Sequence, residues 1–417
     1  GSRPQCRNLR FSAVVPAMPP AGRLFAKALR PRDGAVACAG LFCCVKSRPY
    51  LSCDGADAAK WPLAGYSSAQ NVTGLAKIHE AEQKLLSMML GTPFTARDVP
   101  IQLDVPSRCF VRGPSETKFA IRTVVVGERH AASGRPPIVL VHGFMMGAAA
   151  FFKWLPLLAR ERTVYAIDVI GMGGSGRPPF EADKLSAEEA ENLLVEPFEQ
   201  WAEAMGLTEF DLLGHSFGGF VCSAWAAKHP SRIRCLGLLS PLLGFSDARI
   251  ERIMPKDSDS WQRKALKCVI ETAWARHITP QSLVRWVPGA KGWMERASSR
   301  RFQSMAAGVT EEEGRLLSEY VIATMDMPSS TEASATVCFE PFLRPTEVAG
   351  GTIKRRVARL PMPVFAVYGD RDWMDRAAPE EVPNCQIFTL PDSGHHLYLD
   401  NPEGLSAIVQ AQLQRAA

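Results

Sequence analysis

The stretch Phe210-Asp-Leu-Leu-Gly-His-Ser-Phe-Gly-Gly219 carries the strongest information about the fold. Its first four residues form a short apolar run typical of a buried strand, and a helical pattern follows as far as Pro230. A Gly-x-Ser-x-Gly sequence between a strand and a helix forms a sharp turn, in which only small residues fit beside the strained serine backbone. The pattern predicts that Ser216 lies at the carboxyl edge of a sheet as a candidate nucleophile. A purely structural turn is the alternative.

Further apolar runs on both sides of this turn alternate with helical patterns. They lie at 138–141, 163–167, 210–213, 233–239, 364–368 and 386–390. Strands of a parallel sheet read as near-continuous apolar runs because both of their faces are buried. Helical spacing predicts an amphipathic helix over 76–90, and alternating runs predict antiparallel strands at 101–105, 109–112 and 120–126. The predicted fold class is therefore α/β, with a mostly parallel central sheet and helices on both faces.

A serine hydroxyl is a weak nucleophile and needs a base, which in turn needs an orienting group. Two candidates follow later predicted strands: Asp372 comes after the run 364–368, and His395 comes after the run 386–390. The order Ser216, Asp372, His395 is that of the α/β-hydrolase triad. We therefore predict these three residues as the catalytic set.

Neighbouring residues offer alternatives for two of the three roles. Asp370 and Asp375 compete for the role of the acid, and His396 competes for the role of the base. His395 is preferred because it directly follows Gly394, at the apex of the predicted loop.

A second loop is a candidate oxyanion hole. His142-Gly-Phe144 follows the strand predicted at 138–141, and a turn there can present the N–H of Phe144. Together with the N–H of Phe217, this group would stabilise an oxyanion next to the serine. His142 is interpreted as a residue that packs and holds the loop, and His215 as a residue of the site wall.

Two motif matches have competing explanations. Gly171-Met-Gly-Gly-Ser-Gly176 matches a dinucleotide fingerprint, but prolines at 178 and 179 exclude the helix that would have to follow. The spacing His395-x4-Asp400 matches the His/Asp pair of glycerolipid acyltransferases. Asp400-Asn-Pro-Glu403 is also typical of a capped helix start, and we interpret Asp400 as a capping residue. We expect no nicotinamide or flavin cofactor, and no metal, because no ligand spacing is present.

Residues 241–360 interrupt the alternation of strands and helices. They contain helical patterns broken by three prolines, and we interpret them as a helical cap over the strand ends. Four tryptophans stand among Lys and Arg in this segment: Trp261, Trp274, Trp286 and Trp293. Amphipathic helices of this composition suit a lipid interface. We nevertheless favour the interpretation that these are ordinary cap helices packed on the core, with a lipid interface as the alternative.

Charge and cysteines are unevenly distributed over the 417 residues. Residues 1–60 hold ten Lys/Arg, three Asp/Glu and five of the eleven cysteines. The rest of the chain is nearly neutral, which argues against binding to nucleic acid. Its single cysteines predict a reducing compartment without a disulfide framework. The apolar stretches are too short to cross a bilayer.

The first sixty residues resemble a transit peptide in being rich in Arg, Ala, Pro and Cys and poor in acids. We interpret them as a disordered leader that targets a plastid or mitochondrion. The alternatives are a secretory signal at 34–45, acylation at Cys43-Cys44, or a plain tail on a cytosolic protein that is peripheral on membranes or lipid droplets. The predicted organisation is a leader (1–60), an N-terminal helix and connecting segment (61–114), the core in two parts (115–240 and 361–417) and the cap between them (241–360).

Several motifs together carry a resemblance to a known family. They are Trp61-Pro62, Glu80-Ala-Glu-Gln-Lys-Leu-Leu86, His142-Gly-Phe144, Gly214 to Gly219, Trp373-Met374 and Gly394 to Pro402. From about Trp61 to the C-terminus the chain resembles the α/β-hydrolase domain-containing proteins 4 and 5, most of all their plant and algal members. The resemblance implies an α/β-hydrolase fold with a helical cap.

The resemblance also implies action on glycerolipids, as a phospholipase or lipase. It further implies a lysophosphatidic acid acyltransferase activity, assigned to His395 and Asp400, with acyl-CoA as co-substrate. Animal domain-containing 5 proteins lack the serine and act as lipase co-activators, so Ser216 favours the catalytic branch. We therefore expect a serine hydrolase of glycerolipid acyl esters, peripheral on a membrane or droplet surface. A soluble carboxylesterase for small or isoprenoid esters and a non-catalytic lipid-droplet co-activator are the alternatives, and the protein partner stays open.

Overall fold

The computed structural model describes residues 68–103, 118–131, 133–254, 260–305, 309–346, 353–377, 382 and 384–416. The predicted leader and the predicted strand at 109–112 lie outside these residues. The main sheet contains β1 (Phe94–Gln102), β2 (Lys118–Val126), β3 (Ile138–Val141), β4 (Val164–Ile167), β5 (Phe210–His215), β6 (Ile233–Leu239), β9 (Val364–Gly369) and β10 (Cys385–Leu390). A separate two-stranded sheet consists of β7 (Phe339–Glu340) and β8 (Arg344–Pro345).

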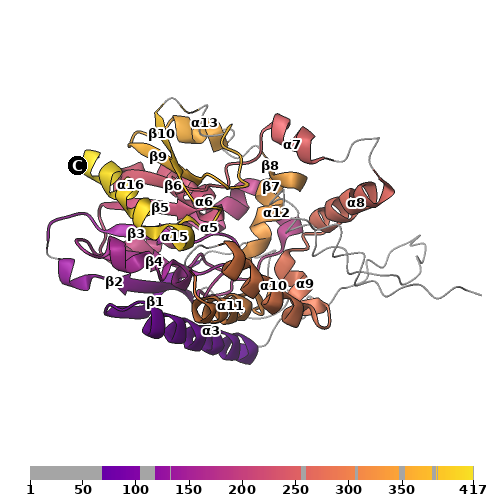
Figure 1. Ribbon diagram of the computed structural model, residues 1–417, viewed down its shortest axis with the longest axis horizontal. Helices are drawn as coiled ribbons and strands as arrows, with labels where there is room; N and C mark the ends of the chain where they lie inside the picture. The colour runs from indigo at the N-terminus through magenta and orange to yellow at the C-terminus, as the bar shows by residue number, and fades with distance from the viewer. Residues whose placement is uncertain are drawn as a thin grey trace, which may run out of the picture.

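The eight strands of the main sheet run through the middle of the molecule in the order β1-β2-β4-β3-β5-β6-β9-β10 (Figure 1). β2 is antiparallel to both β1 and β4, and every other neighbouring pair in this sheet is parallel. The predicted mostly parallel α/β sheet is confirmed. The first strand begins earlier than predicted, because β1 pairs with β2 from Phe94 to Gln102 and so contains only the start of the predicted 101–105, of which residues 104–105 lie outside the described residues.

Helices cover both faces of the sheet, each over its own apolar cluster. One cluster involves α5 (Ala187–Ala204), α6 (Phe217–Lys228), α12 (Ser334–Cys338) and α13 (Ile353–Ala358). The other involves α3 (Ser68–Met89), α4 (Leu155–Leu158), α11 (Glu311–Met325), α15 (Leu397–Asp400) and α16 (Pro402–Arg415). Short 3-10 turns lie at Glu128–His130, Ala148–Phe151, Ala182–Lys184, Pro230–Arg232, Thr331–Ala333 and Pro341–Leu343.

Local sequence signals explain where α5 begins and ends. The Ser186 hydroxyl accepts the N–H of Glu189, and the Glu189 carboxylate accepts the N–H of Ser186, so the two residues form a capping box. Gly206, at φ 67°, follows the end of the helix. Trp201 of α5 is buried and donates its indole N–H to the Thr123 hydroxyl of β2, so the helix is fixed against the sheet.

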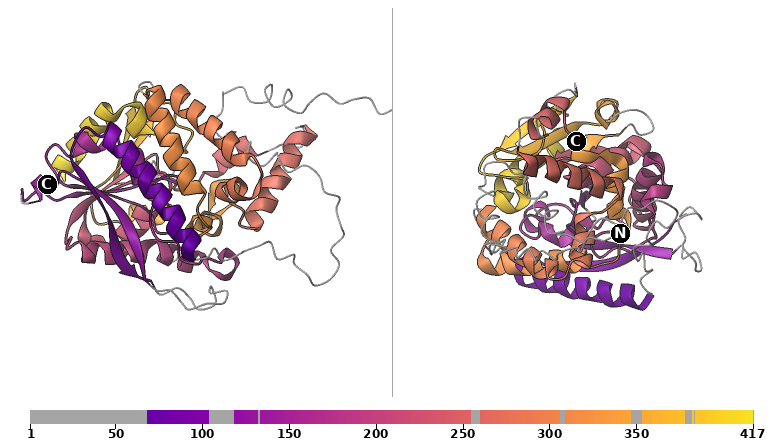
Figure 2. Two further views of the ribbon diagram at one scale, coloured as in Figure 1. Left: turned by 90° about the horizontal axis from the view of Figure 1, so that it is seen from below. Right: turned by 90° about the vertical axis from the view of Figure 1, so that its right-hand side faces the viewer.

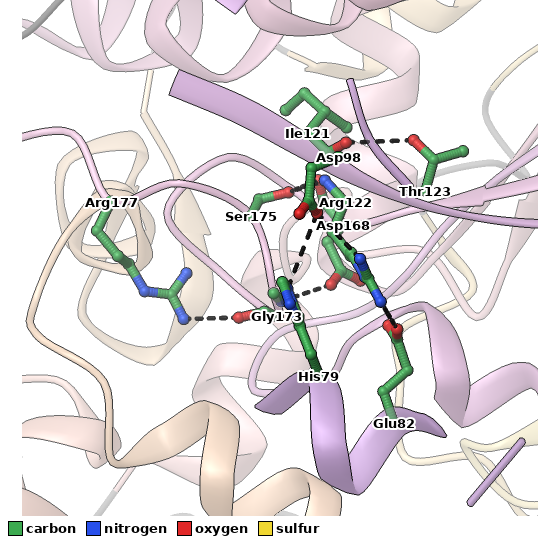
Figure 3. Close-up of polar contacts among 11 residues, drawn as sticks. His79, Glu82, Asp98, Ile121, Arg122, Thr123, Asp168, Gly173, Ser175 and Arg177 are labelled. Atoms are coloured by element: carbon green, nitrogen blue, oxygen red, sulfur yellow. Dashed lines mark hydrogen bonds and ion pairs between the residues drawn. The ribbon is translucent and has the colours of Figure 1, made fainter. Parts of the chain in front are cut away.

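Helix α3 is longer than the predicted 76–90 and joins the sheet to the cap. Its buried Glu82 pairs with Arg122 of β2, which also contacts Asp98 of β1 (Figure 3). Burial raises the pKa of Glu82 to about 7, against the lowering effect of the Arg122 hydrogen bond. Toward the cap, Lys84 forms an ion pair with Glu319 of α11, and α3 lies next to the cap helices in Figure 2.

The segment between β6 and β9 is mainly helical, with α7 (Asp247–Ile253), α8 (Trp261–Ala275), α9 (Pro280–Trp286) and α10 (Ala290–Met305) ahead of α11. Trp274 turns inward and donates its indole N–H to the Phe339 carbonyl at 2.8 Å, so it packs against the body of the protein. The other three tryptophans of this segment, at 261, 286 and 293, are exposed. Within the described part of the chain, no helix is both long and apolar enough to cross a membrane.

Candidate active site

Ser216 occupies the turn between β5 and α6 in a backbone conformation that few residues other than glycine adopt, with φ 53° and ψ −116°. The flanking glycines are sterically required. A Cβ at Gly214 would lie 2.5 Å from the Gly218 carbonyl oxygen, and one at Gly218 would lie 2.5 Å from the carbonyl oxygens of Val141 and His142. The turn therefore holds the serine at the carboxyl edge of the sheet, where the sequence places it.

The three residues predicted as the catalytic set lie together. The Nε2 atom of His395 is 3.1 Å from Ser216 Oγ, and its Nδ1 atom is 3.1 Å from Asp372 Oδ1. His395 comes from the loop after β10, and Asp372 comes from the loop after β9. Ser216 is 8% exposed and His395 is 6% exposed, so the hydrogen bonds lie largely out of water.

The charge of Asp372 sets which ring nitrogen of His395 carries the proton in the neutral imidazole. Burial alone would raise the pKa of Asp372, but the hydrogen bond and charge of His395 hold it below its ordinary value, with smaller contributions from Ser240 and the Met374 N–H. An ionised carboxylate keeps the proton of a neutral imidazole on Nδ1, and Nε2 is then free to accept the Ser216 proton. Ser240, at the end of β6, is a buried contributor to this site that the sequence analysis missed.

The alternative acids and the alternative base have other positions. Asp370 accepts the N–H of Ser393 at 2.9 Å, and Asp375 accepts both the N–H and the hydroxyl of Ser246. Both carboxylates therefore hold loop backbone in place. His396 lies at the start of α15, one residue beyond the histidine that reaches the serine.

Asp400 does not cap the last helix, and the prediction that it does was wrong. The N-cap of α16 is Asn401, whose side chain accepts the N–H of Gly404 at 2.9 Å. Asp400 ends the single turn of α15 and accepts the N–H of Gly394 at 2.8 Å. It therefore holds the loop that carries His395.

The loop after β3 passes directly beside the nucleophile. It forms a turn in which the Met146 N–H donates to the Gly143 carbonyl, and a Cβ at Gly143 would lie 3.1 Å from Ser216 Cβ. Phe144 lies in this turn, with its ring against that of Phe217 at a centroid distance of 5.8 Å. Phe217 begins α6, where the first N–H groups have no acceptor within the helix. The two predicted oxyanion donors thus belong to segments that border the serine.

Two histidines that the sequence analysis assigned to structural roles hold these loops. His142 donates from Nδ1 to the Gly143 carbonyl and accepts the Val169 N–H at Nε2, and burial lowers its pKa to about 4. His215 donates from Nε2 to the His395 carbonyl at 2.9 Å, and its pKa falls to about 3 because of burial. Both imidazoles are neutral at pH 7 and act as fixed hydrogen-bonding groups.

Asp168 is a residue of this region that the sequence analysis missed. It follows β4 directly, and its carboxylate accepts the N–H of Ala148 at 2.5 Å and that of Gly174 at 2.6 Å. Ala148 closes the loop that carries Phe144, so Asp168 anchors one end of the predicted oxyanion loop. Burial raises the pKa of Asp168 to about 6. Asp168 directly follows the strand predicted at 163–167, and this position at a strand end was the sequence signal that could have identified it.

The glycine-rich segment 171–176 lies against this carboxylate, and Figure 3 shows Gly173 and Ser175 near Asp168. A Cβ at Gly173 would lie 2.2 Å from Asp168 Oδ2, so a larger residue there would displace the acid. The N–H of Gly171 donates to the carbonyl of Gly176, and residues 176–181 are not helical. Among the described residues, no three His, Cys, Asp or Glu side chains are grouped so that they could hold a metal ion.

The order and position of Ser216, Asp372 and His395 on this sheet are those of the α/β-hydrolase fold, and the family model for that fold matches residues 136–402. The chain is 34% identical over 367 residues, 84% of either chain, to a 1-acylglycerol-3-phosphate O-acyltransferase of Arabidopsis thaliana. It is 29% identical to human 1-acylglycerol-3-phosphate O-acyltransferase ABHD5, covering 84% of this chain and 93% of the relative. It is 28% identical to a (lyso)-N-acylphosphatidylethanolamine lipase of Bos taurus, covering 81% and 92%.

The protein is therefore an α/β hydrolase. Within that class it belongs to the family of the α/β-hydrolase domain-containing proteins 4 and 5, as its motifs predict.

Proposed function

We propose that this protein is a serine hydrolase of glycerolipid acyl esters that works through an acyl-serine intermediate. The observation that carries the proposal is the continuous contact from Ser216 Oγ through His395 to Asp372, with both hydrogen bonds at 3.1 Å. The names of the relatives, an acyltransferase acting on a lysophospholipid and a lipase acting on a phospholipid, support glycerolipids as the substrate class.

In the first half of the proposed reaction, Ser216 Oγ attacks the acyl carbonyl carbon while His395 Nε2 takes the hydroxyl proton. The N–H groups of Phe144 and Phe217 stabilise the oxyanion, and each such donor contributes about 10²- to 10³-fold to the rate. When the tetrahedral intermediate collapses, the ester C–O bond breaks and the glycerolipid oxygen takes the proton from His395. Asp372 stabilises the imidazolium of His395 between these two proton transfers. The acyl group stays on the serine.

In the second half, His395 takes a proton from water as the water oxygen attacks the acyl-serine carbonyl. The C–O bond to Ser216 breaks, the fatty acid leaves and the proton returns to the serine oxygen. For acyl transfer from acyl-CoA, Ser216 first attacks the thioester carbonyl, the C–S bond breaks, and coenzyme A leaves as the thiol with the proton from His395. A lysophospholipid hydroxyl then takes the place of water in the second half. The names of the first two relatives favour this second activity. It needs no separate role for Asp400, whose carboxylate holds the His395 loop.

A fluorophosphonate probe tests the catalytic serine. We expect the full chain to be labelled and the Ser216→Ala variant to be unlabelled. Ser223→Ala is the matched control, because Ser223 is also buried on α6 and its hydroxyl bonds to the Phe220 carbonyl within the helix. The control should label like the wild type. An unlabelled wild type would contradict the proposal and favour a non-catalytic co-activator.

Product analysis then tests the substrate class. Incubation with mixed phospholipids should release fatty acid, and the release should be lost in Ser216→Ala. Labelled phosphatidic acid, formed from labelled lysophosphatidic acid and acyl-CoA, would demonstrate acyl transfer. Hydrolysis of short soluble esters with no turnover of phospholipid would instead identify a soluble carboxylesterase.

A further inference from the structure

Exposed apolar side chains are concentrated on the cap helices. Five large apolar side chains are exposed among the described residues, and four of them lie on α8 to α10: Trp261, Val269, Trp286 and Trp293. Trp261 is the most exposed of the five, at 74%. The three helices lie at the end of the molecule opposite the C-terminus (Figure 1). An exposed tryptophan leaves the large apolar area of its indole ring in contact with water. Several of them on one surface indicate that this area is buried when the surface binds a ligand, a membrane or another protein.

Helix α8 has two apolar faces, and the fold covers only one of them. Its inner face includes Ala273 and Trp274, which pack toward the core and toward β7. Its outer face follows helical spacing, and each of its residues is exposed: Trp261, Ala265, Cys268, Val269 and Thr272. Lys264 and Gln262 border this outer face on its two sides. The outer face is therefore an apolar stripe with a polar and basic margin.

The same segment is strongly basic. Residues 260–305 contain nine Lys/Arg and two Asp/Glu, an excess of seven positive charges, while the whole chain has a net charge of +5. Some of these charges are paired, as Lys267 is with Glu271 and Lys291 with Asp326. Arg285 is buried in an ion pair with Glu332 and does not contribute to the surface charge. The excess still opposes close approach of a second copy of this surface, and it favours an anionic partner. Tryptophan next to Lys and Arg is the composition of helices that lie in an anionic bilayer interface.

Aromatic contacts link the inner face of α8 to the active site. Trp274 of α8 holds the Phe339 carbonyl, and the Phe339 ring packs on Phe220 at a centroid distance of 5.1 Å. Phe220 packs in turn on Phe217 at 5.6 Å, and Phe217 directly follows the nucleophile. The inner face of α8 is therefore connected, through buried rings, to the helix that follows the nucleophile.

We propose that the outer face of α8, together with the exposed tryptophans of α9 and α10, docks this protein on the surface of an anionic phospholipid bilayer. This inference rests on the proposed function, since it names the surface that presents the glycerolipid substrate. The apolar stripe inserts at the level of the headgroups, and the basic residues interact with lipid phosphates.

Liposome co-flotation of the purified full chain tests the proposal. We expect binding to vesicles of phosphatidylcholine with phosphatidic acid, and much weaker binding to phosphatidylcholine alone or at high salt. The double variant Trp261→Ser/Val269→Ser should bind the anionic vesicles roughly ten-fold more weakly. Met88→Ser is the matched control, because Met88 of α3 is the fifth exposed large apolar side chain and lies away from α8. It should bind like the wild type.

Three binding results would overturn the proposal. They are unchanged binding by the double variant, an equal loss in Met88→Ser, and equal binding to neutral and anionic vesicles. An oligomer in sedimentation that the double variant dissociates would assign the stripe to a second copy and would also overturn it. Thermal unfolding of each variant verifies that it is folded. Fluorophosphonate labelling of the wild type without lipid reports separately on the proposed function, so bilayer binding by an unlabelled wild type would leave the docking surface intact.

Discussion

Asp168 offers the sharpest test of how the oxyanion loop is held. Its carboxylate accepts two backbone N–H groups, at 2.5 Å from Ala148 and 2.6 Å from Gly174. Asp168→Asn keeps the size of the side chain but leaves one acceptor oxygen, so an NH₂ group must face one of the two donors. Charge-assisted hydrogen bonds to a buried group contribute about 1.5–3 kcal/mol each. The substitution removes at least one of them and leaves a buried N–H unsatisfied.

That energy anchors the loop that carries Phe144, so its loss should displace one oxyanion donor. Removal of one donor typically lowers kcat by about 10²- to 10³-fold. We expect Asp168→Asn to lower kcat by about 10²-fold at pH 8 with a small change in KM. Burial raises the pKa of Asp168 to about 6, so the wild type itself loses the ionised acceptor as the pH falls through 6. The ratio of wild-type to variant activity should therefore be large at pH 8 and should shrink at pH 5.

Steady-state hydrolysis of a phospholipid and the rate of fluorophosphonate labelling measure this effect. Glu82→Gln is the matched control, because Glu82 is another buried acid of the same polar cluster and contacts Arg122 (Figure 3). The Glu82→Gln substitution should reduce the free energy of unfolding and leave kcat of the folded protein near that of the wild type. Equal losses in the two variants, or a wild-type kcat in Asp168→Asn, would refute the assignment of Asp168 to the oxyanion loop.

Three further predictions concern other contacts. Asp372→Asn should lower kcat by about 10⁴-fold, because the neutral amide no longer selects the Nδ1–H tautomer of the base; steady-state kinetics measures this, and a loss below ten-fold would contradict it. Gly218→Ala should abolish fluorophosphonate labelling, because its Cβ would lie 2.5 Å from two backbone carbonyl oxygens. Gly292→Ala should label normally, because the nearest atom to its Cβ is in the flexible guanidinium of Arg296. Trp201→Ala should reduce the free energy of unfolding by about 3–5 kcal/mol in denaturant titrations, and Trp293→Ala by less than about 1 kcal/mol, because only the first indole is fully buried.

Much of the fold could be predicted from local patterns. The apolar runs at 138–141 and 233–239 coincide with β3 and β6, and the capping box at Ser186 begins α5. Such features depend on side-chain periodicity and on hydrogen bonds between residues a few positions apart, both of which are visible along the chain. The order Ser216, Asp372, His395 could also be predicted, because the carboxyl ends of parallel strands meet at one sheet edge.

Contacts between remote segments were decided only by the tertiary structure. Asp400 has the sequence context of a helix cap, but the turn of α15 directs its carboxylate to the Gly394 N–H. Trp274 matches the other cap tryptophans in the sequence and differs from them in facing the core. Asp168 carries no motif, and its role depends on two backbone N–H groups from separate loops that converge beside β4. Periodicity determines which residues form an element, whereas the partner of a buried polar atom depends on which remote backbone the packed chain brings within hydrogen-bond distance.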